Sequence, residues 1–303
     1  MGAKTVSNTW ALTRVRMRLA LRNRTFFFFS LAMPLIFLCG AIMIFGKGSP
    51  GRVGYILGAV LTVTVMGSFW GLSVQLVTFR EQGILRRFRL APLGAGPMLA
   101  SSILSNYFMT LPTVVIEIVI CRWVFHMQSW GNLWAILILV TFGSATFSAF
   151  GLIVASVTNT MHETQMINNL TWSALLFLSG ATIPLAVFPV WIRRVSLFNP
   201  ATYLATGLES AGSNLVGTSE VATDVVALSI ALWVAFEISR RLFRWEPESK
   251  VPARAKLWVL VAMIPFLAFG TYENAVGMRL ERVHHNFMQL TGRGAPTDSP
   301  SSR

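Results

Sequence analysis

The chain has 303 residues, of which 54% are hydrophobic and 12% are charged, and its mean hydropathy is +0.60. Soluble domains carry about 25% charged residues, so this composition excludes an ordinary soluble protein, a disordered chain and a disulfide-rich one. The formal charge of +13 would suit nucleic acid, but the basic residues cluster at the ends of apolar runs. That placement argues against a nucleic-acid partner and predicts an all-α polytopic membrane protein.

Residues 1–25 precede the first apolar run and carry an amphipathic pattern. Three apolar residues fall on one helical face and three arginines on another, namely Leu12, Val15 and Leu19 against Arg14, Arg18 and Arg22. We expect an interfacial helix on the cytoplasmic leaflet, with a plain basic flank as the alternative. A secretory signal does not fit, because the apolar run that follows has 20 residues against about 7 to 15 in a signal core.

Six apolar runs approach the ~20 residues that cross a hydrocarbon core of about 30 Å. They are 26–45, 53–79, 101–125, 132–157, 167–188 and 221–239. A seventh run, 257–272, is shorter and contains Pro265, so that spanning the membrane, re-entering it and lying at its surface all stay open. Residues 291–303 are rich in Gly, Pro and Ser, which predicts a disordered tail.

The distribution of basic residues predicts the orientation. With the N-terminus in the cytoplasm, a six-span topology leaves 16 Lys and Arg on the cytoplasmic side and 4 in the opposite loops. Cytoplasmic loops carry such an excess, so we expect a multi-pass protein of the inner or plasma membrane with a cytoplasmic N-terminus. A spanning seventh run would move four tail arginines to the outer side, so the charge count favours six spans.

No catalytic or metal-binding pattern can be recognised in the sequence. The nearest approach to a P-loop, around Gly46-Lys47, has the wrong spacing and lacks the hydroxyl residue that follows the lysine. His162-Glu163 is not followed by a second histidine at metalloprotease spacing, and His284-His285 is a lone pair in a polar segment. We therefore expect a chain that is not an enzyme and holds no metal or cofactor of its own.

The loop after the second span has the sequence REQGILRRFRLAPL, from Arg80 to Leu93. Its four arginines alternate with apolar residues, which predicts a short amphipathic helix ended by Pro92. A surface that combines positive charge with apolar side chains suits docking to another protein. The alternative is a basic loop that faces lipid headgroups.

This loop and a second stretch, FLSGATIPLAVFPVWIRRVSLFNPATYL at 177–204, resemble the ABC-2 type permeases. These are the membrane subunits of a class of ATP-binding-cassette exporters. The second stretch carries the more specific motifs, which are Leu178-Ser179-Gly180, Pro184, Pro189-Val190-Trp191 and Asn199-Pro200-Ala201-Thr202-Tyr203. Drug-resistance permeases of the daunorubicin-exporter kind are similar in size and layout. The resemblance covers roughly residues 8–242.

The resemblance implies a six-span domain at 26–242 that pairs with a second copy around a central path. Two separate ATPase subunits, which would bind ATP and Mg²⁺, would dock on the cytoplasmic coupling loop at 80–100. The implied ATPase contacts are Arg80, Glu81, Arg86, Arg87, Phe88 and Arg89. A re-entrant outer segment is implied at 180–218, with turns at Pro184, Pro189, Asn199 and Pro200. Residues 243–303 form an extension without a family role.

Several polar and aromatic residues within the spans are candidates for the translocation path, namely Phe69, Gln75, Glu117, Asn168 and Trp172. A carboxylate such as Glu117 is costly inside a membrane, so a substrate or proton role is one reading and a structural hydrogen bond or water-lined cavity is the other. Two glycine pairs in the second span, Gly54 with Gly58 and Gly67 with Gly71, predict close helix approach. We favour a helix of the second copy, and not a helix of the same chain, as the neighbour of these glycines.

The sequence thus predicts the permease subunit of an ATP-driven exporter. An amphiphilic drug, a lipid or a glycan precursor would each suit spans this rich in Phe, Met and Trp. An ATP-independent secondary transporter and a membrane-embedded enzyme are the alternatives, and a membrane anchor that recruits cytoplasmic partners is a third. A secondary carrier should show several ionisable groups within the spans, whereas these spans offer mainly Glu117.

Overall fold

The computed structural model describes residues 3–22, 24–46, 50–85, 94–214, 221–244, 258–276 and 278–291. Every regular element within these ranges is helical, which confirms the all-α prediction for the described part of the chain. The elements are α1 (Ala3–Arg22), α2 (Arg24–Phe45), α3 (Pro50–Glu81), α5 (Ala95–Trp123), α6 (Leu133–Val157), α7 (Met161–Ser179), η1 (Leu185–Val187), α8 (Val190–Ser196), α9 (Pro200–Gly212), α10 (Ala222–Leu242), α11 (Trp258–Val261), α12 (Ile264–Val276) and α13 (Met278–Thr291).

The six apolar runs overlap α2, α3, α5, α6, α7 and α10 in that order, but the fifth run, 167–188, extends beyond the end of α7 at Ser179 into η1. Among the described residues, α3, α5, α6 and α10 are long and apolar enough to cross a membrane by themselves. In α2 the apolar part is the shorter stretch Leu31–Phe45. The polar side chains of α7, among them Asn168 and Asn169, lower its hydropathy. The chain is therefore a multi-pass membrane protein.

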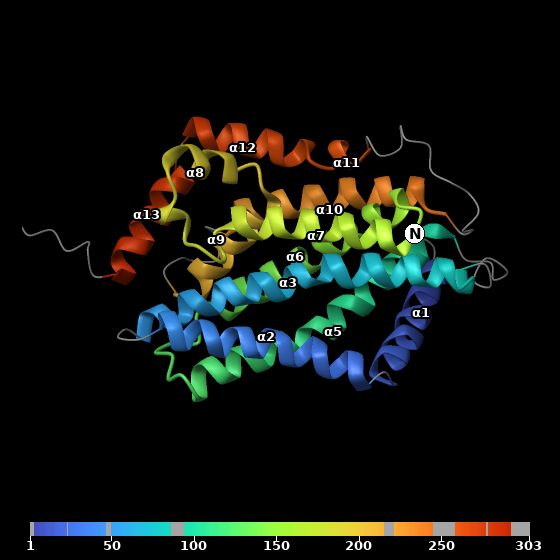
Figure 1. Ribbon diagram of the computed structural model, residues 1–303, viewed down its shortest axis with the longest axis horizontal. Helices are drawn as coiled ribbons and strands as arrows, with labels where there is room; N and C mark the ends of the chain where they lie inside the picture. Colours follow the sequence, from blue (N-terminus) through green and yellow to red (C-terminus); the bar gives the residue numbers. More distant parts are fainter. Residues whose placement is uncertain are drawn as a thin grey trace, which may run out of the picture.

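Helices α3 and α6 form the centre of the bundle (Figure 1). α3 packs on α6, α9, α5 and α7, while the far side of α6 packs on α10. The two central helices come so close that a Cβ on Gly151 would overlap the backbone of Phe69. Because this approach leaves no room for side chains between the backbones, α3 and α6 act as one rigid unit.

Short polar signals define where the later helices begin and end. The side-chain oxygen of Asn132 accepts from the Ala135 N–H at 3.1 Å and caps α6, and Thr160 caps α7 through the Glu163 N–H at 3.2 Å. Gly180, at φ +94°, ends α7 in the left-handed region that favours glycine. Asn199 caps α9, with Pro200 in its first turn.

Three short helices fill the segment between α7 and α10, where the sequence predicts outer turns. Pro184 and Pro189 stand directly before η1 and α8, and Pro200 begins α9. α9 is almost wholly buried and packs on α3, α6, α7 and α10. In Figure 1, α8 and α9 lie at the opposite end of the bundle from α1.

Helix α1 occupies the predicted N-terminal position and packs mainly on α5. Thr13 and Arg16 are buried, whereas Val15, assigned to the apolar face by its spacing, is 49% exposed. The Arg16 guanidinium lies 5.6 Å from the ring centroid of Phe79. Burial lowers the pKa of Arg16 to about 10, so it stays charged at neutral pH.

The first glycine pair of α3 does not face a second copy. A Cβ on Gly54 would overlap the carbonyl group of Gly212, and one on Gly58 would overlap the backbone of Glu209. Both neighbours belong to α9 of the same chain, so the preference for a partner subunit is wrong for this pair. By contrast, Gly67 has nothing within 4 Å of its Cβ position and is exposed.

We expect Gly58→Ala to lower the stability of the folded protein by about 1 to 3 kcal/mol, because the added methyl group meets backbone that cannot rotate away. The measurement is thermal unfolding of the purified protein in mild detergent. Gly67→Ala is the matched control on the same helix, and it should be neutral or slightly stabilising. Equal losses in the two variants would contradict the close α3–α9 approach.

Candidate functional site

The base of the predicted coupling loop lies at the turn between α6 and α7, in a group of contacts that we call the inner-turn cluster (Arg80, Glu81, Thr158, Met161 and Arg244). Arg80, the penultimate residue of α3, is 3% exposed. Its guanidinium donates hydrogen bonds to the Ala155 and Thr158 carbonyls, both at 2.8 Å. These carbonyls lie at the C-terminal end of α6, where cations are favoured by the helix dipole.

Glu81 and Arg244 complete the inner-turn cluster from two further elements. The Glu81 carboxylate accepts the Met161 N–H at 2.7 Å, at the first residue of α7. Arg244, which follows α10, donates to the Thr158 carbonyl at 2.8 Å and to the Ser156 carbonyl at 3.2 Å. Burial lowers the pKa of Arg244, which remains a cation at neutral pH. The ends of α3, α6, α7 and α10 are thus tied together at one point.

The predicted ATPase contacts therefore fall into two groups. Arg80 and Glu81 are bound within the chain itself, Arg80 in the interior and Glu81 at an exposed position. Leu85 is fully buried and anchors the start of the loop against the bundle. Arg86, Arg87, Phe88 and Arg89 lie outside the described residues. Arg80 acts as a positioning residue for the base of this loop.

Polar side chains within the bundle form contacts that link α3 to its two neighbours. Asn168 of α7 donates to the Ser73 hydroxyl at 2.6 Å. On the other side of α3, the Thr64 hydroxyl donates to one carboxylate oxygen of Glu117 at 2.7 Å. The second oxygen of Glu117 is buried and has no hydrogen-bond partner among the described residues. Such a group is costly in a membrane, so it marks a position with a functional or hydration requirement.

The five path candidates do not form one wall in the single chain. Phe69 is 1% exposed and belongs to the core of the bundle, packed beside Gly151. Gln75 and Trp172 are half-buried, on α3 and α7. Glu117 and Asn168 each face α3, but they come from α5 and α7, which pack against different sides of it.

One face of α7 is exposed among the residues that the structure describes. Its exposed residues are Gln165, Met166, Asn169, Leu170, Ala174 and Phe177, at the spacing of one helical face. Leu170 is 76% exposed, and two of the six side chains carry amides. A mixed polar and apolar face on a membrane helix suits a second protein surface or a water-lined path better than lipid.

The family comparison agrees with this architecture. Residues 7–211 match the family model described as ABC-2 type transporter. The chain belongs to the ABC-2 type transporter family. Members of this family are transport membrane subunits that are not themselves catalytic. The matched range includes the inner-turn cluster except Arg244, the whole of α7, η1 and α8, and α9 up to residue 211.

A curated relative of this ABC-2 chain is the Linearmycin resistance permease protein LnrN of Bacillus subtilis (strain 168). The two are 23% identical over 164 residues, which cover 54% of this chain and 41% of the relative. The matched stretch is thus less than half of the relative's length.

Sequence reasoning missed several charged residues that the ABC-2 fold brings together. Arg244 joins the inner-turn cluster, and Glu209, Asp224 and Arg279 lie at the opposite end. One feature of the sequence could have pointed to Asp224, because it is an acidic residue at the start of the sixth apolar run. Its partner Arg279 is 55 positions away and could be found only from the tertiary structure.

We expect Arg80→Met to lower the stability by about 2 to 3 kcal/mol, because the Ala155 carbonyl loses a charged donor in the interior. Thermal unfolding in detergent measures this loss. Arg240→Met removes an arginine of which 52% is exposed and should change the midpoint little. An unchanged midpoint for Arg80→Met would show that the inner-turn cluster does not hold α3 to α6.

Proposed function

We propose that this chain is the permease subunit of an ATP-binding-cassette exporter in the cell membrane, with its N-terminus in the cytoplasm. The inner-turn cluster is the observation that carries the proposal. A force applied to the loop after Arg80 passes through the buried hydrogen bonds of Arg80 into the end of α6 and through the exposed Glu81 hydrogen bond into the start of α7. ATP binding and hydrolysis by a separate subunit docked on that loop would supply the force.

The second part of the proposal concerns the dimer. Two copies of the chain would meet across the exposed face of α7, where Gln165 and Asn169 stand among apolar side chains. The amides would then contact the other copy or line the path between them instead of facing lipid. Gln75 and Trp172, which are half-buried in one chain, are the path candidates nearest to this role.

For the cargo we propose an amphiphilic compound. The relative in Bacillus subtilis is named for linearmycin resistance, which supports the export of a toxic small molecule over that of a lipid or glycan precursor. The apolar and aromatic exposed surfaces of the bundle, such as Phe177 at 60% and Leu170 at 76%, suit such a molecule. The segment from 180 to 218 would be the re-entrant outer part of this exporter.

The test is affinity purification of the chain from its own membranes in mild detergent, followed by mass spectrometry and an ATPase assay. We expect a P-loop ATPase to copurify in near-equimolar amount. The double variant Arg86→Glu/Arg87→Glu should insert normally and lose the ATPase, because two positive charges of the docking loop are reversed.

Arg14→Glu/Arg18→Glu is the matched control for this experiment, since both arginines are exposed on α1. This control should keep the ATPase. Retention of the ATPase by Arg86→Glu/Arg87→Glu, or transport that persists without any ATPase, would overturn the proposal.

Glu117 favours a second candidate, an ion-coupled carrier, because one of its buried oxygens is free. We expect Glu117→Gln to retain both stability and transport, since an amide oxygen can still accept from Thr64. Transport by vesicles with and without an imposed proton gradient measures this. Loss of transport in Glu117→Gln at wild-type stability, with gradient-driven uptake in the wild type, would favour the carrier.

A further inference from the structure

Helix α12 of the C-terminal extension is part of the hydrophobic core. Phe266 is fully buried, and its ring centroid lies 5.7 Å from that of Tyr203 and 6.2 Å from that of Phe150. A Cβ on Gly270 would come within 3.0 Å of the Leu197 carbonyl oxygen, so the α12 backbone lies directly against the segment before α9. The extension therefore packs as an integral helix of the bundle.

The stretch 258–276 is long enough to cross the membrane. It contains α11 and α12, joined by a turn at residues 262 and 263. If it were fully helical, its 19 residues would extend about 28 Å, close to the thickness of the hydrocarbon core. Figure 1 shows α11 and α12 lying alongside α10 and reaching the end of the bundle where α8 lies, and α12 packs on α10.

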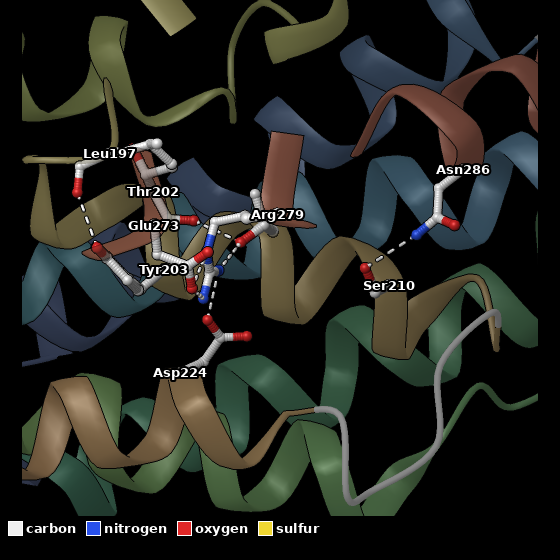
Figure 2. Close-up of polar contacts among 9 residues, drawn as sticks. Leu197, Thr202, Tyr203, Ser210, Asp224, Glu273, Arg279 and Asn286 are labelled. Carbon is white, nitrogen blue, oxygen red and sulfur yellow. Dashed lines mark hydrogen bonds and ion pairs between the residues drawn. The ribbon is translucent and has the colours of Figure 1, made fainter. Parts of the chain in front are cut away.

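Helix α13 then turns across the end of the bundle and inserts Arg279, which is 5% exposed (Figure 2). Its guanidinium pairs with Asp224 at 2.5 Å and with Glu273 at 3.2 Å, and it donates to the Thr206 hydroxyl at 2.9 Å. It also lies 4.5 Å from the ring centroid of Tyr203. We call these contacts the Arg279 latch.

Without the extension, Asp224 would be a buried carboxylate with no cation beside it. It lies in the first turn of α10 and is 3% exposed. Removing one partner of a buried ion pair costs far more than the pair contributes, because the remaining charge is left uncompensated. The six-span part of this chain is therefore built to receive Arg279.

A small pocket of about 10 Å³, which has room for roughly one water molecule, lies beneath α13. Its lining includes Tyr55, Thr206, Glu209, Ser210, Val283 and Asn286, of which the last two belong to α13. Glu209 is 5% exposed, and one of its carboxylate oxygens has no hydrogen-bond partner among the described residues. The contact across the pocket between Asn286 and Ser210 is long, at 3.4 Å (Figure 2).

We infer that residues 258–276 are a seventh membrane-spanning segment and that α13 is a lid over this pocket, held shut by the Arg279 latch. The position of this lid on the outer side of the membrane rests on the proposed cytoplasmic N-terminus, whereas the seventh crossing does not. The lid stays closed at rest because opening it separates Arg279 from two carboxylates. Opening exposes Glu209 at the end of the α3–α9 contact.

The crossing is tested by labelling single-cysteine variants with an impermeant maleimide in intact cells and in opened membranes. The background carries Cys39→Ala and Cys121→Ala. Gln289→Cys reports on α13, and Gln82→Cys reports on the far end of α3, both at exposed positions. We expect Gln289→Cys to label in intact cells and Gln82→Cys only in opened membranes.

The possible outcomes distinguish the seventh crossing from the proposed cytoplasmic N-terminus. The reverse pattern would keep the seventh crossing and overturn only the proposed orientation. Labelling of both positions under the same condition would place both ends on one side and overturn the crossing. Neither measurement depends on an ATPase partner or on transport.

The latch is tested by the labelling rate of Ser213→Cys, at the edge of the pocket, in purified protein. We expect Arg279→Gln to raise this rate by roughly tenfold or more, because the closed state loses a buried ion pair. Glu281→Gln neutralises an exposed charge on the same helix and should leave the rate unchanged. If Arg279→Gln does not fold, Asp224→Asn/Arg279→Gln removes both charges and should give the same rise. An unchanged rate in the folded variant would overturn the lid.

Discussion

The close backbone contact of α3 with α6 and α9 is the constraint on which the rest of the structure depends. Gly151 permits the first contact, and Gly54 with Gly58 permits the second. Between helices in a membrane no hydrophobic driving force exists, so close packing over small residues supplies the attraction. Because α3 is held on two sides, its two ends become fixed points to which loops and terminal segments can be attached.

Guanidinium groups secure both ends of this scaffold, with Arg80 and Arg279 buried and Arg244 half-buried. At one end Arg80 and Arg244 donate to the carbonyls that close α6, which satisfies backbone acceptors left free by the end of the helix. At the other end Arg279 meets Asp224 and Glu273. The first arrangement is a set of charged hydrogen bonds to backbone carbonyls, with the carboxylate of Glu163 near both arginines. The second is a pair of opposite charges that can separate, which suits a part that moves.

The two ends of the bundle would have different tasks in a transporter of this family. A membrane subunit of an ABC-2 type transporter needs a rigid connection to whatever supplies energy, and the inner-turn cluster joins four helix ends at the base of the predicted docking loop. It also needs an exit that can open and close. In the proposed reading α13 closes that exit, so the C-terminal extension has a task that the six-span domain alone does not supply.

The sequence by itself determined the class of protein, because apolar runs of membrane length can satisfy their backbone only as helices. The positions of those helices, and of the prolines and caps at 184–200, followed from local signals. Which residues meet across the bundle was decided only by the tertiary structure. Helical spacing predicted a close approach at Gly58, but only the arrangement of neighbouring helices shows that the neighbour is α9 of the same chain and that Arg16 is buried. Arg279 reaches Asp224 for the same reason, since no local pattern encodes a contact between segments so distant in the chain.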